Sequence, residues 1–72
     1  MTYYLRMKDH TGRGYKSLLP FETKEEREAH VVLSMVGDGA DEDEVAGNIA
    51  LLDMQETVEY EHTEYEYLVV SQ

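Results

Sequence analysis

Basic and acidic residues divide this chain into two unequal parts. All six lysines and arginines lie within residues 1–27, whereas residues 28–72 contain twelve carboxylates and no lysine or arginine. The formal charge is +2 for the first part and −12 for the second, which together give the −10 of the chain. Because dense like charge destabilises a compact chain through self-repulsion, we expect moderate salt to raise the melting temperature.

The length of the chain limits how its fold is stabilised. Its 72 residues suffice for one domain, and a domain of this size buries only about 60% of its unfolded surface. There is no cysteine, so neither a disulfide nor a thiolate metal site supplements the small core. Oligomerisation is one remedy, which makes a homodimer a natural expectation. The apolar residues are nevertheless too many, at 42%, for a disordered acidic tail.

Targeting signals are absent from the sequence as it stands. No apolar run approaches the roughly 18 residues of a membrane span, and the first residues lack the apolar centre of a signal peptide. The lack of cysteine agrees with a reducing compartment. We therefore expect a soluble, cytoplasmic protein with no membrane partner.

Residues 3–8 alternate in polarity, with Tyr3, Leu5 and Met7 at the apolar positions. A period of two with aromatic residues predicts a strand with one covered face. Residues 9–14 contain two glycines and are typical of a turn, so residues 15–19 are expected to form the returning strand. Pro20 has no N–H to donate, which ends this strand or places it at the edge of a sheet.

Residues 23–37 carry the signals of a capped helix. Thr23 and Glu26 form a capping box, and Gly37 suits the position just after a helix end. These signals predict a helix from Lys24 to Val36. Four apolar residues at helical spacing are expected to form its core face: Ala29, Val32, Leu33 and Val36. Val31 and Met35 fall beside this stripe and are expected to widen the core face, with partner contact as the alternative.

A second helix is predicted from Glu42 to Met54. Residues 41–44 repeat the capping pattern. An apolar stripe follows them at helical spacing: Val45, Ala46, Ile49 and Leu52. Gly47 disfavours this helix by about 1 kcal/mol relative to alanine, so a strand over residues 49–54 is the competing prediction.

The last segment, residues 56–70, alternates in polarity but changes phase near His62 and Thr63. Such a shift indicates a bulge or a turn, so the segment is either a hairpin or one long, bent strand. Neither His62 nor Thr63 is favoured in a tight hairpin turn. The apolar run of residues 68–70 is typical of a strand covered on both faces.

These elements together predict an α+β fold. We expect a small antiparallel sheet of three or four strands, with one or two helices packed on one face, in the order β-β-α-α-β(-β). The acidic strand would then expose its glutamates on the other face or along an edge.

Two groups of carboxylates are candidates for binding a partner. Residues two apart in a strand lie about 6.5–7 Å apart on one face, a spacing of the same order as that of neighbouring phosphates. The first group is expected to form such a line of charge: Glu59, Glu61, Glu64 and Glu66. The second group lies at a helix start: Asp41, Glu42, Asp43 and Glu44. Surfaces of this kind compete for proteins that bind phosphate with lysine and arginine, although a solvated face that keeps the protein soluble is the alternative.

Tyrosines lie among these acids and offer rigid contact area with a polar tip. Tyr4, on the side of its strand opposite to Leu5, is a candidate contact residue, and so is Tyr65. Tyr60 and Tyr67 are expected to belong to the core instead. The basic residues of the first hairpin are expected to pair with acids of the same chain or of a second copy.

Metal binding and catalysis have little support. The acidic residues 38–49 do not match the ligand positions of a calcium-binding EF-hand, and the three histidines lie too far apart for a zinc site. No nucleophile motif and no phosphate-binding glycine pattern occurs. We therefore expect no enzyme, no cofactor and no metal.

The sequence favours a non-enzymatic, acidic protein-binding domain. Its expected partner is a basic, nucleic-acid-binding protein whose surface it occupies as a DNA mimic would, while its charge disfavours direct nucleic-acid binding. In composition alone the chain resembles small phage-encoded proteins that inhibit host enzymes, a viral resemblance that assigns no site. The alternative is a structural or oligomerisation module whose acidity only provides solubility, and a third, weaker hypothesis is a regulatory domain with a divalent-ion site.

Overall fold

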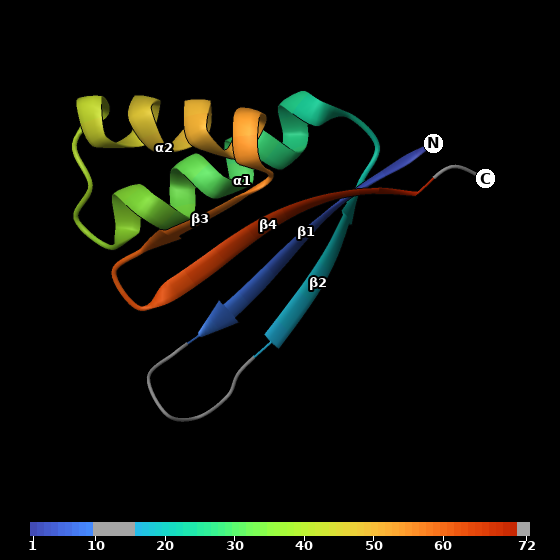
Figure 1. Cartoon of the computed structure of the whole chain (residues 1–72), viewed down its shortest axis with the longest axis horizontal. Helices are drawn as coiled ribbons and strands as arrows, with labels where there is room; N and C mark the ends of the chain where they lie inside the picture. Colours follow the sequence, from blue (N-terminus) through green and yellow to red (C-terminus); the bar gives the residue numbers. More distant parts are fainter. Residues whose placement is uncertain (10–15, 71–72) are drawn as a thin grey trace.

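The computed structural model describes residues 1–9 and 16–70, which form one sheet covered by two helices (Figure 1). The elements follow one another as β1 (Thr2–Asp9), β2 (Lys16–Phe21), α1 (Lys24–Gly37), α2 (Glu42–Gln55), β3 (Thr57–Tyr60) and β4 (Thr63–Val70). The four strands are antiparallel in the order β2-β1-β4-β3. Both helices lie on the same face of the sheet, so the predicted α+β fold is confirmed.

The first two strands pair as predicted. Leu5 is fully buried beneath the helices, in register with Leu19 on β2 and Tyr67 on β4. Pro20 lies in β2, which is an edge strand, where a missing N–H leaves no inner hydrogen bond unmade. The turn predicted at residues 9–14 lies almost wholly outside the described residues.

Helix α1 begins where its capping box predicts and ends later than expected. The Thr23 hydroxyl accepts a hydrogen bond of 3.1 Å from the backbone N–H of Glu26. Gly37 remains helical, and it is Gly39 that adopts the positive φ, +99°, that turns the chain toward α2. The prediction that Gly37 follows the helix end is therefore wrong by about one residue, within the usual fraying of helix ends.

The face of α1 that packs on the sheet is not the predicted stripe. Val31 and Met35, expected only to widen the core face, are both fully buried and form its centre. Leu33 is 73% exposed and Val36 53% exposed, while Ala29 is also exposed. The buried line is i, i+4 spaced and begins with Arg27, a charged residue that a search for apolar periodicity passes over.

One arginine, Arg27, is buried between α1 and the sheet at the edge of the core. Arg27 is only 5% exposed, and its Nη1 donates hydrogen bonds to the carbonyl oxygens of Leu68 (3.1 Å) and Tyr4 (3.4 Å). Its guanidinium carbon lies 3.8 Å from the centre of the Tyr67 ring and 5.4 Å from that of Tyr3. Carbonyl oxygens and ring faces thus offset the cost of burying this charge.

Helix α2 forms as predicted, and the alternative strand over residues 49–54 is wrong. The Asp41 carboxylate accepts a 2.8 Å hydrogen bond from the backbone N–H of Glu44. Val45, Ile49 and Leu52 are buried against the sheet, whereas Ala46 is exposed. The helix ends at Gln55, and Glu56, which caps it, takes a left-handed conformation with φ of 68°.

The last segment is a hairpin and not one bent strand. Residues 61 and 62 form its turn, and Glu61 has the positive φ, 55°, that the first central position of mirror-image hairpin turns requires. Strand β4 is an inner strand, but Val69 is 51% exposed, so the expected cover on both faces is wrong there. No helix within the described residues combines the length and apolar character needed to cross a membrane.

Candidate partner-binding surfaces

The open face, which we define as the face of the sheet turned away from α1 and α2, is apolar toward one end. Tyr4 faces Leu68 on β4 and Pro20 on β2. Leu18, two residues before Pro20 on the same face of the strand, is 56% exposed. Tyr4, a predicted contact residue, is therefore on the exposed side of the sheet as expected, half-buried among apolar neighbours.

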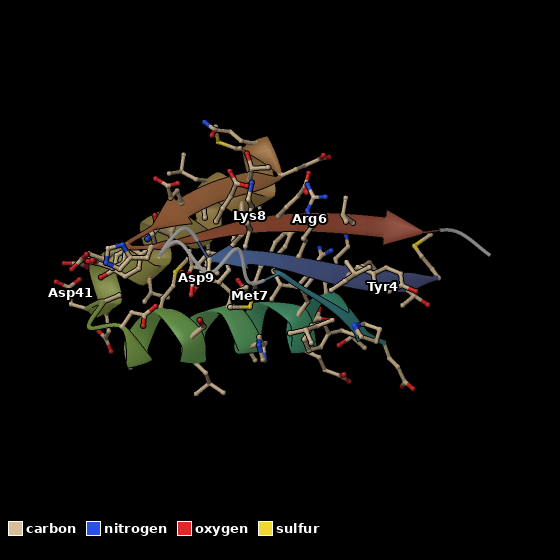
Figure 2. All side chains as sticks on the ribbon, turned by 90° about the horizontal axis from the view of Figure 1, so that it is seen from below. Tyr4, Arg6, Met7, Lys8, Asp9 and Asp41 are labelled. Atoms are coloured by element: carbon tan, nitrogen blue, oxygen red, sulfur yellow. The ribbon has the colours of Figure 1, made fainter. Side chains whose placement is uncertain are left out.

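The other end of the open face carries charges of both signs. Arg6 on β1 forms an ion pair with Glu66 on β4, and Lys8 lies opposite Glu64 (Figure 2). Glu59 on β3 is in register with Glu64. The hairpin cations thus offset part of the acidic strand, as expected of basic residues that pair within the chain.

The four glutamates of the last hairpin do not form the single predicted line. Glu64 and Glu66 lie on one strand and Glu59 on its neighbour, whereas Glu61 lies in the turn between the strands. The strand register decides this arrangement, because it sets Glu59 beside Glu64 and not in line with it. Their role in binding a partner stays a prediction.

Tyr65 is buried and cannot contact a partner in this fold. Its side chain is fully enclosed, and its hydroxyl lies 2.7 Å from the Ser34 hydroxyl of α1. Tyr65 shares the covered face with Tyr67, because both alternate with the open-face glutamates. The prediction of Tyr65 as a contact residue is wrong, while the core placement of Tyr67 and, in part, Tyr60 is confirmed.

The strongest concentration of carboxylates lies at one end of the molecule, where the α1–α2 loop and the β3–β4 turn come together (Figure 1). We call this group the acidic end: Asp38, Asp41, Glu42, Asp43, Glu44 and Glu61. Figure 2 shows Asp41 at this extremity, far from Tyr4. Asp38 and Glu61 line one shallow pocket there, together with Asp9. Within residues 1–9 and 16–70, no lysine or arginine lines this pocket with them.

The acidic end has a local structural cause as well as a net charge. Residues 42–44 form the first turn of α2, where negative side chains favour the helix dipole by about 0.3–1 kcal/mol each. Burial raises the pKa of Tyr60, and the nearby negative charges of Glu44, Glu61 and Asp38 raise it further. Three carboxylates of the acidic end thus lie close enough to Tyr60 to disfavour its ionised form, and the same negative potential would favour a cation.

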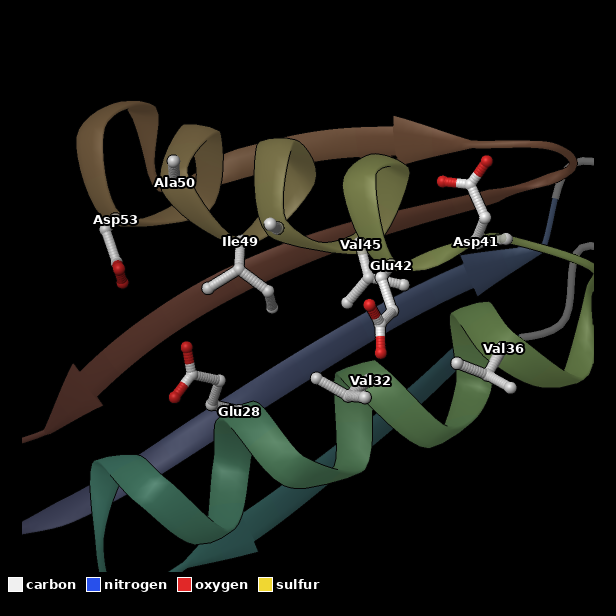
Figure 3. Close-up of a pocket in the computed structure, with 11 residues that line it drawn as sticks. Glu28, Val32, Val36, Asp41, Glu42, Val45, Ile49, Ala50 and Asp53 are labelled. Atoms are coloured by element: carbon white, nitrogen blue, oxygen red, sulfur yellow. The ribbon is translucent and has the colours of Figure 1, made fainter.

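A groove of about 800 Å³ runs between the two helices on the outer side of the molecule (Figure 3). Its apolar walls come from both helices: Val32 and Val36 of α1, and Val45, Ala46, Ile49 and Ala50 of α2. Val32 and Val36 belong to the stripe that the sequence assigns to the core. These two residues of the stripe line the groove, with Val32 also packed in part against the core, whereas Ala29 and Leu33 are exposed outside the groove.

Carboxylates rim the groove at both ends. Glu28 and Asp53 approach its one end from opposite helices, while Glu42 and Asp41 stand toward the other (Figure 3). Asp41 and Glu42 also belong to the acidic end, so the two surfaces are continuous. The described residues that line the groove include no lysine, arginine or histidine.

The described residues contain no group of three or more histidines, aspartates or glutamates arranged to hold a metal ion. A search against protein-family models, curated proteins and solved structures finds no match for this chain. The charge and shape of its own surface therefore carry the functional argument.

Proposed function

We propose that the chain is a non-enzymatic protein-binding domain that occupies the basic surface of a nucleic-acid-binding partner. The observation that carries the proposal is the acidic end, where six carboxylates from two loops and one helix start lie together, with no lysine or arginine of the described residues in the group. A basic partner would exchange its phosphate contacts for these carboxylates. The mechanism is steric and electrostatic competition, in the manner of a DNA mimic.

The acidic end supports this role better than the last hairpin does. Glu66 is engaged by Arg6, and Glu64 lies opposite Lys8, so part of the open-face charge is already offset. An exposed ion pair of this kind leaves little net field for a partner to detect. We therefore assign the larger part of the binding to residues 41–44.

Two variants that each remove four charges test the assignment. One carries Asp41→Asn, Glu42→Gln, Asp43→Asn and Glu44→Gln, in which asparagine still caps α2. The other carries Glu59→Gln, Glu61→Gln, Glu64→Gln and Glu66→Gln. The immobilised chain should capture nucleic-acid-binding proteins from lysate at low salt, release them at high salt, and lose them to competing DNA.

The expected result is a larger loss of capture for the helix-start variant than for the hairpin variant. Circular dichroism checks that both variants remain folded. If capture is equal for the wild type and both variants, or DNA does not compete, the proposed function is wrong.

A homo-oligomerisation module is the second candidate, favoured by the apolar end of the open face. Tyr4, Leu68 and the exposed Leu18 form a patch that a second copy could cover. Sedimentation would then show a mass that rises with concentration and falls with Leu18→Lys. A monomer at high concentration would eliminate this candidate.

A further inference from the structure

We propose that the groove between α1 and α2 binds an amphipathic helix of the partner, one whose apolar stripe is flanked by lysine or arginine. The proposal rests on the proposed function and names the element by which the partner is recognised. Because the groove shares Asp41 and Glu42 with the acidic end, one ligand can engage both surfaces.

The shape and lining of the groove suit a helix. The lining residues run from Glu28 to Val36 on α1 and from Glu42 to Asp53 on α2, so the groove is about 12–17 Å long, or roughly two to three turns of a docked helix. Val36 is 53% exposed, while Val45 and Ile49 form a floor that is almost closed to solvent. Apolar anchors spaced at i, i+3 or i+4, and i+7 fill grooves of this kind.

The rim determines the charge of the occupant. Glu42 leans over the apolar wall, and no cation is among the described residues that line the groove. Glu28 and Asp53 converge from opposite helices at the other end, where Lys24 and Arg27 lie beside them in an adjoining pocket, so the charge at the Asp41 and Glu42 end is the less offset of the two. Lysine and arginine can cover apolar walls with their alkyl stems while their charged heads reach such carboxylates. A second copy of this chain, with its net charge of −10, would instead meet repulsion along the rim.

The test pairs two substitutions of the same chemistry. Ala50→Glu places a bulky negative side chain on the groove wall, and Ala29→Glu places one on the exposed side of α1, outside the groove. Glutamate is a good helix former, so both variants should fold, which circular dichroism verifies. If charge attraction alone governs binding, both variants should bind a basic ligand more tightly. If the ligand occupies the groove, Ala50→Glu should weaken binding because its side chain blocks the groove, whereas Ala29→Glu should not.

The probe is a fluorescent synthetic helix of leucine and lysine, roughly 18 residues long, with leucines along one face. Fluorescence anisotropy compares it with a scrambled peptide of equal composition and with one whose lysines are replaced by glutamine. We expect the leucine–lysine helix to bind best, and Ala50→Glu to weaken it about tenfold. Ala29→Glu should leave the affinity unchanged or slightly higher.

Other outcomes overturn the proposal in distinguishable ways. If the scrambled peptide binds equally and both variants strengthen binding, charge alone governs recognition, so the groove proposal fails while the proposed function stands. If the peptide with glutamine in place of lysine binds equally well, recognition does not need basic side chains, which contradicts a basic partner. Failure of every lysine peptide to bind at low salt contradicts both the groove and the proposed function. A dimer that Ala50→Glu dissociates would identify a second copy as the occupant.

Discussion

The two faces of the sheet place neighbouring residues of β1 in opposite environments. Leu5 is enclosed beneath the helices, while Arg6, the next residue, meets Glu66 on the open face. The covered face also contains Arg27, a cation held by backbone carbonyls and tyrosine rings. An arginine thus packs in the core on the face of the sheet that the helices cover, whereas an arginine on the open face neutralises a glutamate. We therefore expect the covered face to contribute most of the free energy of unfolding.

The largest expected effect comes from truncating the covered face. Leu5→Ala should lower the free energy of unfolding by about 3 kcal/mol, because it leaves a cavity in a small core. Urea denaturation measures this loss, with Tyr4→Ala on the open face as the matched control. An equal loss for Tyr4→Ala would mean that the open face is also covered, as in an oligomer.

A smaller loss is expected from removing the buried cation. Arg27→Met keeps the aliphatic stem but leaves the carbonyls of Tyr4 and Leu68 without their donor, at a cost of about 2 kcal/mol. Arg6→Met, the same change on the open face, should cost under about 1 kcal/mol. Thermal unfolding of both variants compares the two arginines directly. Similar melting temperatures would contradict the larger contribution expected of Arg27.

The hydroxyl of Tyr65 should matter less than either residue. Tyr65→Phe removes its hydrogen bond to Ser34, which we expect to cost about 1 kcal/mol in urea denaturation. Ser34→Ala is the reciprocal control. If the double variant loses as much as the two single losses combined, the two hydroxyls are not coupled.

The Arg6–Glu66 pair should contribute only about 0.5 kcal/mol, because the arginine is half-exposed and the pair is screened by salt. Glu66→Gln measures this contribution at low and high salt. The loss should shrink at high salt, even though salt stabilises the chain as a whole by screening its net charge. A loss that is large and independent of salt would contradict the contrast between the two faces.

The smallest effect at neutral pH is expected for Tyr67→Phe, because the buried Tyr67 hydroxyl finds no hydrogen-bond partner among the described residues. Burial raises the pKa of Tyr67 to about 12, against the opposing charge of Arg27. Between its unfolded pKa of about 10 and this value only the unfolded state ionises, so stability should fall as the pH rises through that window. In Tyr67→Phe the free energy of unfolding should therefore fall less steeply between about pH 10 and pH 12 than in the wild type. Identical pH dependence in both proteins would contradict the raised pKa of Tyr67.

Local signals in the sequence were sufficient for most elements of the fold. Thr23 and Asp41 each accept the predicted capping bond, and the alternation around Leu5 correctly separates the two faces of β1. These features depend on contacts within four residues, which a sequence displays directly. The sequence alone does not decide between a hairpin and a bent strand near Glu61, because the turn uses a positive φ in a residue that does not favour it.

The facing of α1 and the arrangement of charge depended on contacts that the sequence does not display. Helix α1 has two i, i+4 lines, and the one that packs on the sheet begins with Arg27, whose stabilising carbonyls lie on strands far along the chain. Apolar periodicity alone therefore assigns Val32 and Val36, which line the groove, to the core. The glutamates of the last hairpin are likewise separated by strand register, which follows from the pairing of β3 with β4.

The two ends of the described chain lie side by side, since Thr2 on β1 is in register with Val70 on β4. Figure 1 places the start of β1 and the end of β4 on the side away from the α1–α2 loop. A short linker could therefore join the ends, and new termini could be opened at the β3–β4 turn without cutting a helix. A fusion tag or surface tether attached at either end would likewise leave the acidic end pointing outward.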